Sequence, residues 1–276
     1  MSPDKPSLAH LRTSVFKHSA GGPEIGSWPA RRLARPSAVL GTWAAVRLGA
    51  SADSVTAASA LSAALGAVAI GAGSRRLFVA GTCLQLLAYW LDHVDGQVAR
   101  WRGTAGVKGV YLDYLMHHAQ ALGLGFALGF GLSRLTGELL WSLAGFLIAA
   151  GWTFLSLHND CRYKAFFQRL KRDSATYRVI GGSGDRPGAP MGWPGRGLGR
   201  WTWPASKACE PHGVLAGLVG LSALAVVDPS AWTIAWKLVV ATMAALAPSL
   251  AIARIARAAR RDAPGAEFAR WFRVDG

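Results

Sequence analysis

Six long apolar stretches dominate the chain and predict its architecture. Each approaches the roughly 20 residues that an α-helix needs to cross about 30 Å of hydrocarbon. Apolar runs of this length favour helices in a bilayer over the core of a soluble domain. We therefore expect an all-α, polytopic membrane protein with six transmembrane helices. The predicted spans are residues 54–73, 77–99, 109–132, 138–160, 212–228 and 231–255.

The composition agrees with a membrane protein and argues against nucleic-acid binding. The chain has 276 residues, of which 51% are hydrophobic and 16% charged, and its net charge is +15. Its basic residues lie between the apolar stretches and form no stripe interleaved with aromatic residues, so we expect no nucleic-acid partner. Three widely spaced cysteines suggest neither a disulfide framework nor a metal knuckle.

The distribution of Lys and Arg predicts the orientation of the spans. If the N-terminus is cytoplasmic, 26 of the 30 Lys and Arg residues fall in cytoplasmic segments, as the positive-inside rule requires. We therefore expect a multi-pass protein of the cell membrane with both termini in the cytoplasm. The other four basic residues lie at or near the opposite side: Arg75, Arg76, Arg134 and Lys237.

Segments outside the spans complete the predicted organisation. Residues 1–50 form a cytoplasmic segment, in which residues 28–49 mix Arg with apolar side chains and predict an amphipathic helix in the membrane interface. A basic tail with local helix is the alternative. Residues 51–261 form the membrane domain, and its segment 162–209 is expected to be a basic, irregular cytoplasmic loop. Residues 262–276 are expected to form an amphipathic tail.

Ionisable residues interrupt the second and third spans near their cytoplasmic ends. Asp92 and Asp95 share one helical face of the second span. Asp113 and His117 share a face of the third. Charged side chains at membrane depth are costly and usually face a cavity or each other. Clustered carboxylates repel unless a divalent cation lies between them, and their oxygen atoms suit Mg²⁺ or Mn²⁺. The pattern thus predicts a metal-binding cavity on the cytoplasmic side.

Small and basic residues accompany the acidic ones. Gly96, Ala99 and Gly109 allow a ligand to approach the backbone closely. Arg100 and Lys108 can meet phosphate oxygens. We therefore expect the ligand of this cavity to carry phosphate.

This stretch resembles the signature of the CDP-alcohol phosphatidyltransferase family, D-x-x-D-G-x-x-A-R-x8-G-x-x-x-D-x-x-x-D. Seven positions match in residue and spacing, whereas the last position is His117 where the family has Asp. Before the first span, the family pattern Pro-Asn-x-x-Thr is retained only at Thr56. The resemblance also implies six spans, an N-terminal interfacial helix and a homodimer. The seven matching residues are Asp92, Asp95, Gly96, Ala99, Arg100, Gly109 and Asp113.

The resemblance implies an activity in phospholipid biosynthesis. A phosphatidyl or related phosphoalcohol group would move from CDP-diacylglycerol, or another CDP-alcohol donor, to a hydroxyl acceptor with release of CMP. His117 and Asp113 are the implied catalytic residues, and Mg²⁺ or Mn²⁺ is the implied cofactor. The implied metal ligands are Asp92, Asp95, Asp113 and His117, and the implied contacts to the CDP moiety are Thr56, Gly96, Ala99, Arg100 and Gly109.

His117 leaves two interpretations open. Imidazole can bind Mn²⁺ and can take a proton near neutral pH, so the site can be retuned, with a single metal ion or a preference for Mn²⁺. Alternatively, the substitution marks a weakened family member that binds CDP-lipid without turning it over. A transporter is a third class, but it would need acids along a path through several spans, and here they are concentrated in one cluster.

The acceptor has only a weak signature. Basic residues directly after the fourth span suit a phosphorylated acceptor such as inositol phosphate or glycerol phosphate. Positive-inside charge that meets anionic membrane lipids explains them equally well. Four polar residues near the same interface, His93, His118, Asn159 and Asp160, are expected to be interface residues and not catalysts. The basic residues are Arg162, Lys164, Arg169, Lys171 and Arg172.

Overall fold

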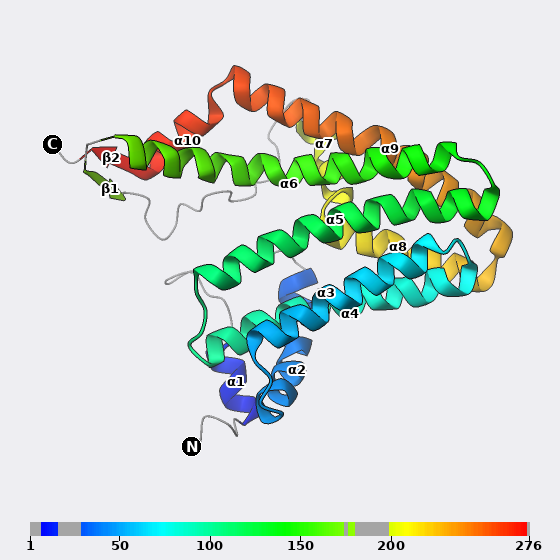
Figure 1. The fold of residues 1–276 in the computed structure, drawn as a ribbon, viewed down its shortest axis with the longest axis horizontal. Helices are drawn as coiled ribbons and strands as arrows, with labels where there is room; N and C mark the ends of the chain where they lie inside the picture. Colours follow the sequence, from blue (N-terminus) through cyan, green and yellow to red (C-terminus); the bar gives the residue numbers. More distant parts are fainter. Residues whose placement is uncertain (1–6, 16–28, 174–175, 180–198, 275–276) are drawn as a thin grey trace.

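The computed structural model describes residues 7–15, 29–173, 176–179 and 199–274, and these are mostly helical (Figure 1). The elements are α1 (Leu8–Ser14), the π-helical turn η1 (Ala30–Ala34), α2 (Arg35–Arg47), α3 (Ala52–Gly71), α4 (Arg75–Trp101), α5 (Val107–Thr136), α6 (Leu140–Arg172), β1 (Tyr177–Val179), α7 (Gly199–Ala208), α8 (Pro211–Val227), α9 (Pro229–Arg260), α10 (Ala263–Trp271) and β2 (Phe272–Val274).

Four of these helices, α3, α4, α6 and α9, are long and apolar enough to cross a membrane. Large apolar side chains such as Val68, Phe146 and Ile252 are exposed along them, as expected of surfaces that face lipid. The predicted all-α fold is therefore confirmed, and these four helices support a membrane protein. Of the two other predicted spans, α8 has 17 residues, and the glycines and polar side chains of α5 lower its mean hydropathy. Length and composition thus establish four candidate spans among the described helices, not six.

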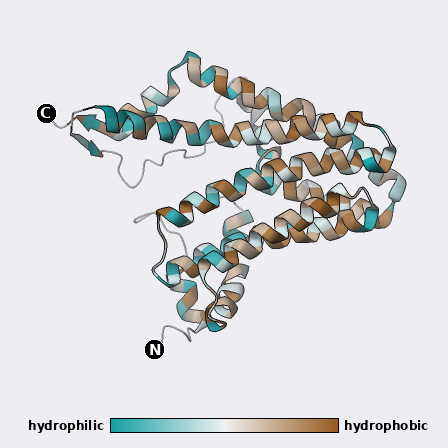
Figure 2. Cartoon of the chain, viewed as in Figure 1, coloured by the Kyte–Doolittle hydropathy of each residue, from teal (hydrophilic) through white to brown (hydrophobic). Residues whose placement is uncertain are grey.

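The long helices form a closed ring. α3 packs against α4 and α5, α6 packs against α5 and α9, and α8 packs against α4 and α9. Hydrophobic residues run along these helices, and hydrophilic residues gather toward their ends (Figure 2). The core includes Trp236, which is fully buried, with its ring centroid 4.7 Å from that of Phe78 and 5.1 Å from that of Trp232. Interlocked aromatic side chains thus fix the end of the ring where α4 and α9 begin.

The helix formed by η1 and α2 packs against the C-terminal half of α4. Residues 30–47 are helical through η1 and α2, and they bury Val39, Thr42 and Val46. Gly41 lies so close to Trp90 that a Cβ atom there would be 2.5 Å from the indole ring. A helix in this region is therefore confirmed, although Trp28 lies outside the described residues. Its place in a membrane interface remains a prediction.

The structure differs from the predicted loop at residues 162–209. α6 continues through the basic residues as far as Arg172, and part of the remaining segment forms β1 and α7. β1 pairs antiparallel with β2, and Phe268 of α10 is buried against Phe166 of α6, at 5.6 Å between ring centroids. The predicted tail therefore covers the end of α6, which keeps that end helical.

Candidate active site

The candidate site lies where α4 ends and α5 begins. α4 closes at a turn in which Gly103 has a φ of 65°, a conformation that favours glycine, and α5 starts four residues later. α3 packs against both helices, whereas α4 and α5 touch each other little. The first turns of α3 therefore separate the two halves of the motif, and side chains must reach across to meet.

Three side chains of the motif meet across this separation. The Nε2 atom of His117 lies 3.4 Å from Oδ1 of Asp113 and 4.0 Å from Oδ1 of Asp92. Each of the three residues offers one ligand atom, and these atoms lie within 4.8 Å of one another. The side chains of Asp92, Asp113 and His117 are 27%, 51% and 44% exposed, so a ligand from outside can reach them.

Asp95, the fourth predicted metal ligand, is not part of this group of three. Its Oδ2 accepts a hydrogen bond of 2.6 Å from Oγ1 of Thr56 on α3. Thr56 was predicted as a contact to the CDP moiety, and its hydroxyl also bonds to the carbonyl of Ala52. Thr56 therefore joins α3 to α4 directly beside the cluster, and it holds Asp95 in place.

The other motif residues surround the site in different ways. Arg100 donates from Nε to the carbonyl of Val15, at 2.7 Å, and so ties the segment after α1 to α4. A Cβ atom on Gly96 would lie 3.2 Å from Nη1 of Arg100, whereas Gly109 has open space on its side-chain face. The carbonyl of Ala99 accepts a bond from the Thr104 amide in the turn that follows α4.

Lys108 and one predicted interface residue, His93, have acidic neighbours. Lys108, which was expected to meet phosphate, forms an ion pair with Asp53 at the start of α3. Nδ1 of His93 lies 3.6 Å from Oδ2 of Asp92, whereas Nε2 of His117 approaches the other oxygen, Oδ1. Asp92 is thus flanked by two imidazoles, one from α4 and one from α5.

A second polar group lies on α5 and α6. Nε2 of His118 is 3.1 Å from Oδ2 of Asp160, and the Nδ1 atom of His118 contacts the carbonyl of Tyr114 at 2.6 Å. Nearby, Arg162 donates to Glu267 of α10 at 2.7 Å and to Asn159 at 3.0 Å. Arg162 therefore has protein partners that the sequence interpretation did not anticipate.

Gln97 is a residue of the site region that the sequence analysis missed. Its side chain is fully buried and donates from Nε2 to the carbonyl of Arg35, at 2.9 Å. Its Oε1 accepts a 2.8 Å bond from Oγ1 of Thr42 in α2. A buried amide with both ends bonded fixes register between α2 and α4. The available signal was an uncharged polar residue one position after Gly96, among buried valines.

The chemistry of the three clustered donors fits a divalent cation. Two carboxylates and an imidazole suit Mn²⁺ or another borderline cation, and the carboxylates alone suit Mg²⁺. Both carboxylates are partly exposed, so water or phosphate oxygens can complete the coordination. The arrangement can hold a phosphate-bearing ligand beside an imidazole that accepts a proton.

Comparisons with known proteins leave the family open. No family model matches the chain, and no curated protein matches it. The motif residues and their geometry are therefore the basis of any functional assignment.

Proposed function

We propose that this chain is a membrane-embedded transferase of the CDP-alcohol phosphatidyltransferase type. It moves a phosphatidyl or related phosphoalcohol group from a CDP-linked lipid donor to a hydroxyl acceptor and releases CMP. The observation that carries the proposal is the meeting of Asp92, Asp113 and His117, which lie on two helices that touch each other little. These residues occupy the motif positions that the family uses for metal binding and proton transfer.

The proposal includes the number of membrane spans and their orientation. In it, α5 and α8 complete six spans with the four apolar helices, η1 and α2 lie at the membrane interface, and both termini and the site are cytoplasmic. The distribution of Lys and Arg supports this orientation. A homodimer is the assembly that the family resemblance implies.

The side chains suit distinct roles in such a transfer. Asp92 and Asp113 are the carboxylates that hold Mg²⁺ or Mn²⁺, with Asp95 kept beside them by Thr56. A cation bound there would neutralise the negative charge of the pyrophosphate. Gly109, with open space beside it, leaves room for the nucleotide.

His117 is the residue that we assign to the proton. Its Nε2 lies 3.4 Å from Oδ1 of Asp113. As the acceptor oxygen forms its bond to phosphorus, its proton passes to Nε2, and the bond between phosphorus and the CMP oxygen breaks. The same nitrogen cannot bind a metal ion while it accepts a proton, so Asp113 remains the ligand during this step.

CMP release tests the proposal. Purified protein would be incubated with CDP-diacylglycerol, with Mn²⁺ or Mg²⁺, and with a panel of polyols, polyol phosphates and serine. We expect CMP to appear only with metal ion and a suitable acceptor, and to be lost in the Asp113→Asn variant. Asp53→Asn is the matched control, because Asp53 is an exposed carboxylate paired with Lys108 outside the cluster.

A binding protein without turnover is the second candidate, and His117 is the observation that favours it. In that case CDP-diacylglycerol would bind and the nucleotide would remain intact with every acceptor. Absence of both binding and CMP release would overturn the assignment to this family.

A further inference from the structure

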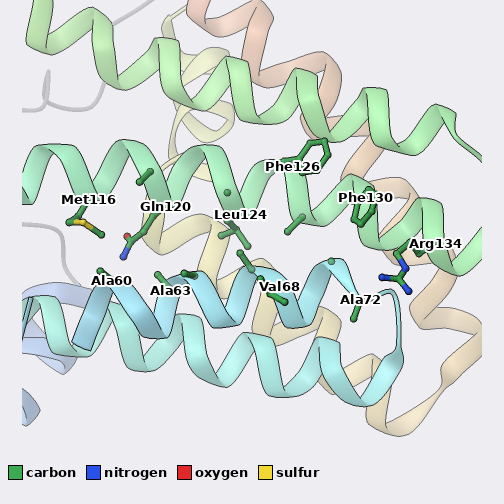
Figure 3. A pocket seen from close by; sticks show the side chains of 16 residues that line it. Ala60, Ala63, Val68, Ala72, Met116, Gln120, Leu124, Phe126, Phe130 and Arg134 are labelled. Carbon is green, nitrogen blue, oxygen red and sulfur yellow. The ribbon is translucent and has the colours of Figure 1, made fainter. Parts of the chain in front are cut away.

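A long apolar trough runs between α3 and α5, and one of its ends lies next to the candidate site. Its volume is about 560 Å³, within the usual range for small-molecule sites. Figure 3 shows Ala60, Ala63 and Val68 of α3 facing Leu124 and other residues of α5 across it.

Along α5 the trough extends from Met116, the residue before His117, past Gln120 to Arg134, which lies at the other end, toward Ala72 (Figure 3). From Gln120 to Arg134 the helix rises about 21 Å, whereas one leaflet of a bilayer has roughly 15 Å of hydrocarbon. The trough is therefore long enough to hold an acyl chain that enters from the Arg134 end.

Positive charge gathers at that end. Gly73, in the turn between α3 and α4, lies against Arg134, since a Cβ on Gly73 would be 2.9 Å from the Cβ of Arg134. Arg75 and Arg76 follow this turn and open α4, and both are exposed. Of the four basic residues that the sequence places on this side, Arg134 thus lines the trough, and Arg75 and Arg76 follow within four residues of Ala72, which also lines it. The fourth, Lys237, lies 3.1 Å from Glu138.

The acidic residues near this end are already engaged. Glu138 contacts Lys237 and accepts a bond from the Trp141 indole at 3.1 Å. Asp228 caps α9, where Oδ1 accepts bonds from the Ser230 and Ala231 amides. Within the described part of the chain, no acidic side chain pairs with Arg75, Arg76 or Arg134.

We infer that this trough binds an anionic phospholipid, with its phosphate at Arg134 and one acyl chain between α3 and α5. Guanidinium groups recognise phosphate oxygens in pairs of hydrogen bonds and are weakly hydrated. The apolar walls match an acyl chain, and the cationic mouth matches an anionic headgroup. Arg134 lies about 30 Å along α5 from Asp113, so the headgroup position is separate from the proposed catalytic site and does not depend on it.

Lipid binding to purified protein tests the inference. Delipidated protein in a zwitterionic detergent would be titrated with phosphatidylglycerol or phosphatidylcholine and followed by native mass spectrometry. We expect tighter binding of phosphatidylglycerol, weakened roughly fivefold by Arg134→Gln. Replacing Arg75, Arg76 and Arg134 together by Gln should weaken it roughly a hundredfold. The charge control replaces Arg257, Arg260 and Arg261 by Gln, since these are exposed residues at the far end of α9.

The second part of the experiment fills the trough with a larger side chain. Gly123 faces it with its nearest neighbour, Cβ of Ala67, 4.0 Å from an added Cβ. Gly123→Phe should weaken both lipids at least tenfold, whereas Gly217→Phe, which adds the same bulk in open space on α8, should not. Ala64→Leu serves the same purpose if Gly123→Phe lowers the thermal unfolding midpoint.

Three results would overturn the inference. If the triple arginine replacement leaves phosphatidylglycerol binding unchanged, these arginines do not bind the headgroup. If both trough-filling variants leave lipid binding unchanged, the trough does not hold an acyl chain. If the trough-filling variants lose self-association and their lipid binding is unchanged, the trough would instead be a contact with a second copy of this chain.

Discussion

At the residue scale, His117 is the residue by which the proposed metal site would select its cation. Its imidazole faces two carboxylates from one nitrogen, at 3.4 Å and 4.0 Å. A neutral imidazole carries one negative charge less than the aspartate that the family has at this position. The cluster therefore attracts a hard, strongly hydrated cation less than three carboxylates would.

Exchange of this histidine for aspartate tests the idea directly. In the His117→Asp variant we expect CMP release in Mg²⁺ to rise relative to that in Mn²⁺, because a third carboxylate favours the harder ion. The measurement is the ratio of the two rates across a range of metal concentrations. An unchanged ratio would show that His117 does not contribute to metal selection.

The role of Asp113 in metal binding can be tested without substrate. Its Oδ1 is the cluster atom closest to His117 Nε2, so Asp113→Asn removes a charged ligand and should weaken Mn²⁺ binding at least roughly tenfold. The loss of the electron paramagnetic resonance signal of free Mn²⁺ during titration measures this binding. Equal affinities of Asp113→Asn and Asp53→Asn would contradict a metal site at the cluster.

At the level of elements, α5 and α6 make a very close helix contact. A Cβ atom on Gly129 would lie 2.2 Å from the Trp141 carbonyl and 2.3 Å from the Gly145 amide nitrogen. Small residues that allow such approach are typical of helix pairs in membranes. Because backbone atoms cannot yield as a flexible side chain does, the two helices must separate if Gly129 gains a methyl group.

Gly129→Ala should therefore destabilise the protein by about 1–3 kcal/mol, the usual cost of overpacking. Gly217→Ala is the matched control, since an added Cβ meets nothing within 4 Å on α8. That control should leave stability unchanged or raise it by up to about 1 kcal/mol, because alanine favours helix. Thermal unfolding in detergent compares the two, and equal midpoints would refute the close contact.

The attachment of α2 to α4 depends on one buried amide. Gln97→Leu would leave the Arg35 carbonyl and the Thr42 hydroxyl without this partner, at a cost of about 1–3 kcal/mol. We expect faster backbone hydrogen exchange in α2 and little change in α9, measured by mass spectrometry. If Thr42→Val is then added, little more stability should be lost, because the only bond left to the Thr42 hydroxyl would be the one to the carbonyl of Ala38 in its own helix.

The spacing of apolar and polar residues along the sequence predicted the helices well and the contacts between them poorly. It placed Asp92 and Asp113 on inward faces, but whether Asp95 would join them depended on Thr56, a residue of a third helix. Likewise, the basic residues after position 160 resembled a loop. They remain helical because Phe166 packs against Phe268, about a hundred residues further along the chain, and a local pattern contains no information about such a partner.

For the whole molecule, the proposed six-span topology adds crossings by α5 and α8 to those of the four apolar helices. α5 carries two of the three cluster residues near its start, and Arg134, the proposed lipid contact, near its end. Both proposed sites therefore depend on the crossing of α5.

Two turns that flank α5 allow a direct test of that crossing. Arg102 lies in the exposed turn before α5, and Leu139, 79% exposed, lies in the turn after it. In a background with Cys83, Cys161 and Cys209 replaced by Ser, we expect Leu139→Cys to react with a membrane-impermeant maleimide in intact cells. Arg102→Cys should react only after permeabilisation, because 26 of the 30 basic residues favour a cytoplasmic side for its turn.

The pattern of labelling separates the possible failures. If both cysteines react from the same side, α5 does not cross, and then the cluster and Arg134 cannot lie at opposite faces of a bilayer. If the two sides are exchanged, α5 crosses but the site faces outward, where a CDP-linked donor made in the cytoplasm cannot reach it. Val227→Cys, in an 82% exposed position at the end of α8, should react from the same side as Leu139→Cys if α8 also crosses. Its 17 residues rise about 26 Å, close to the thickness of the hydrocarbon core, so a crossing requires α8 to stand nearly upright.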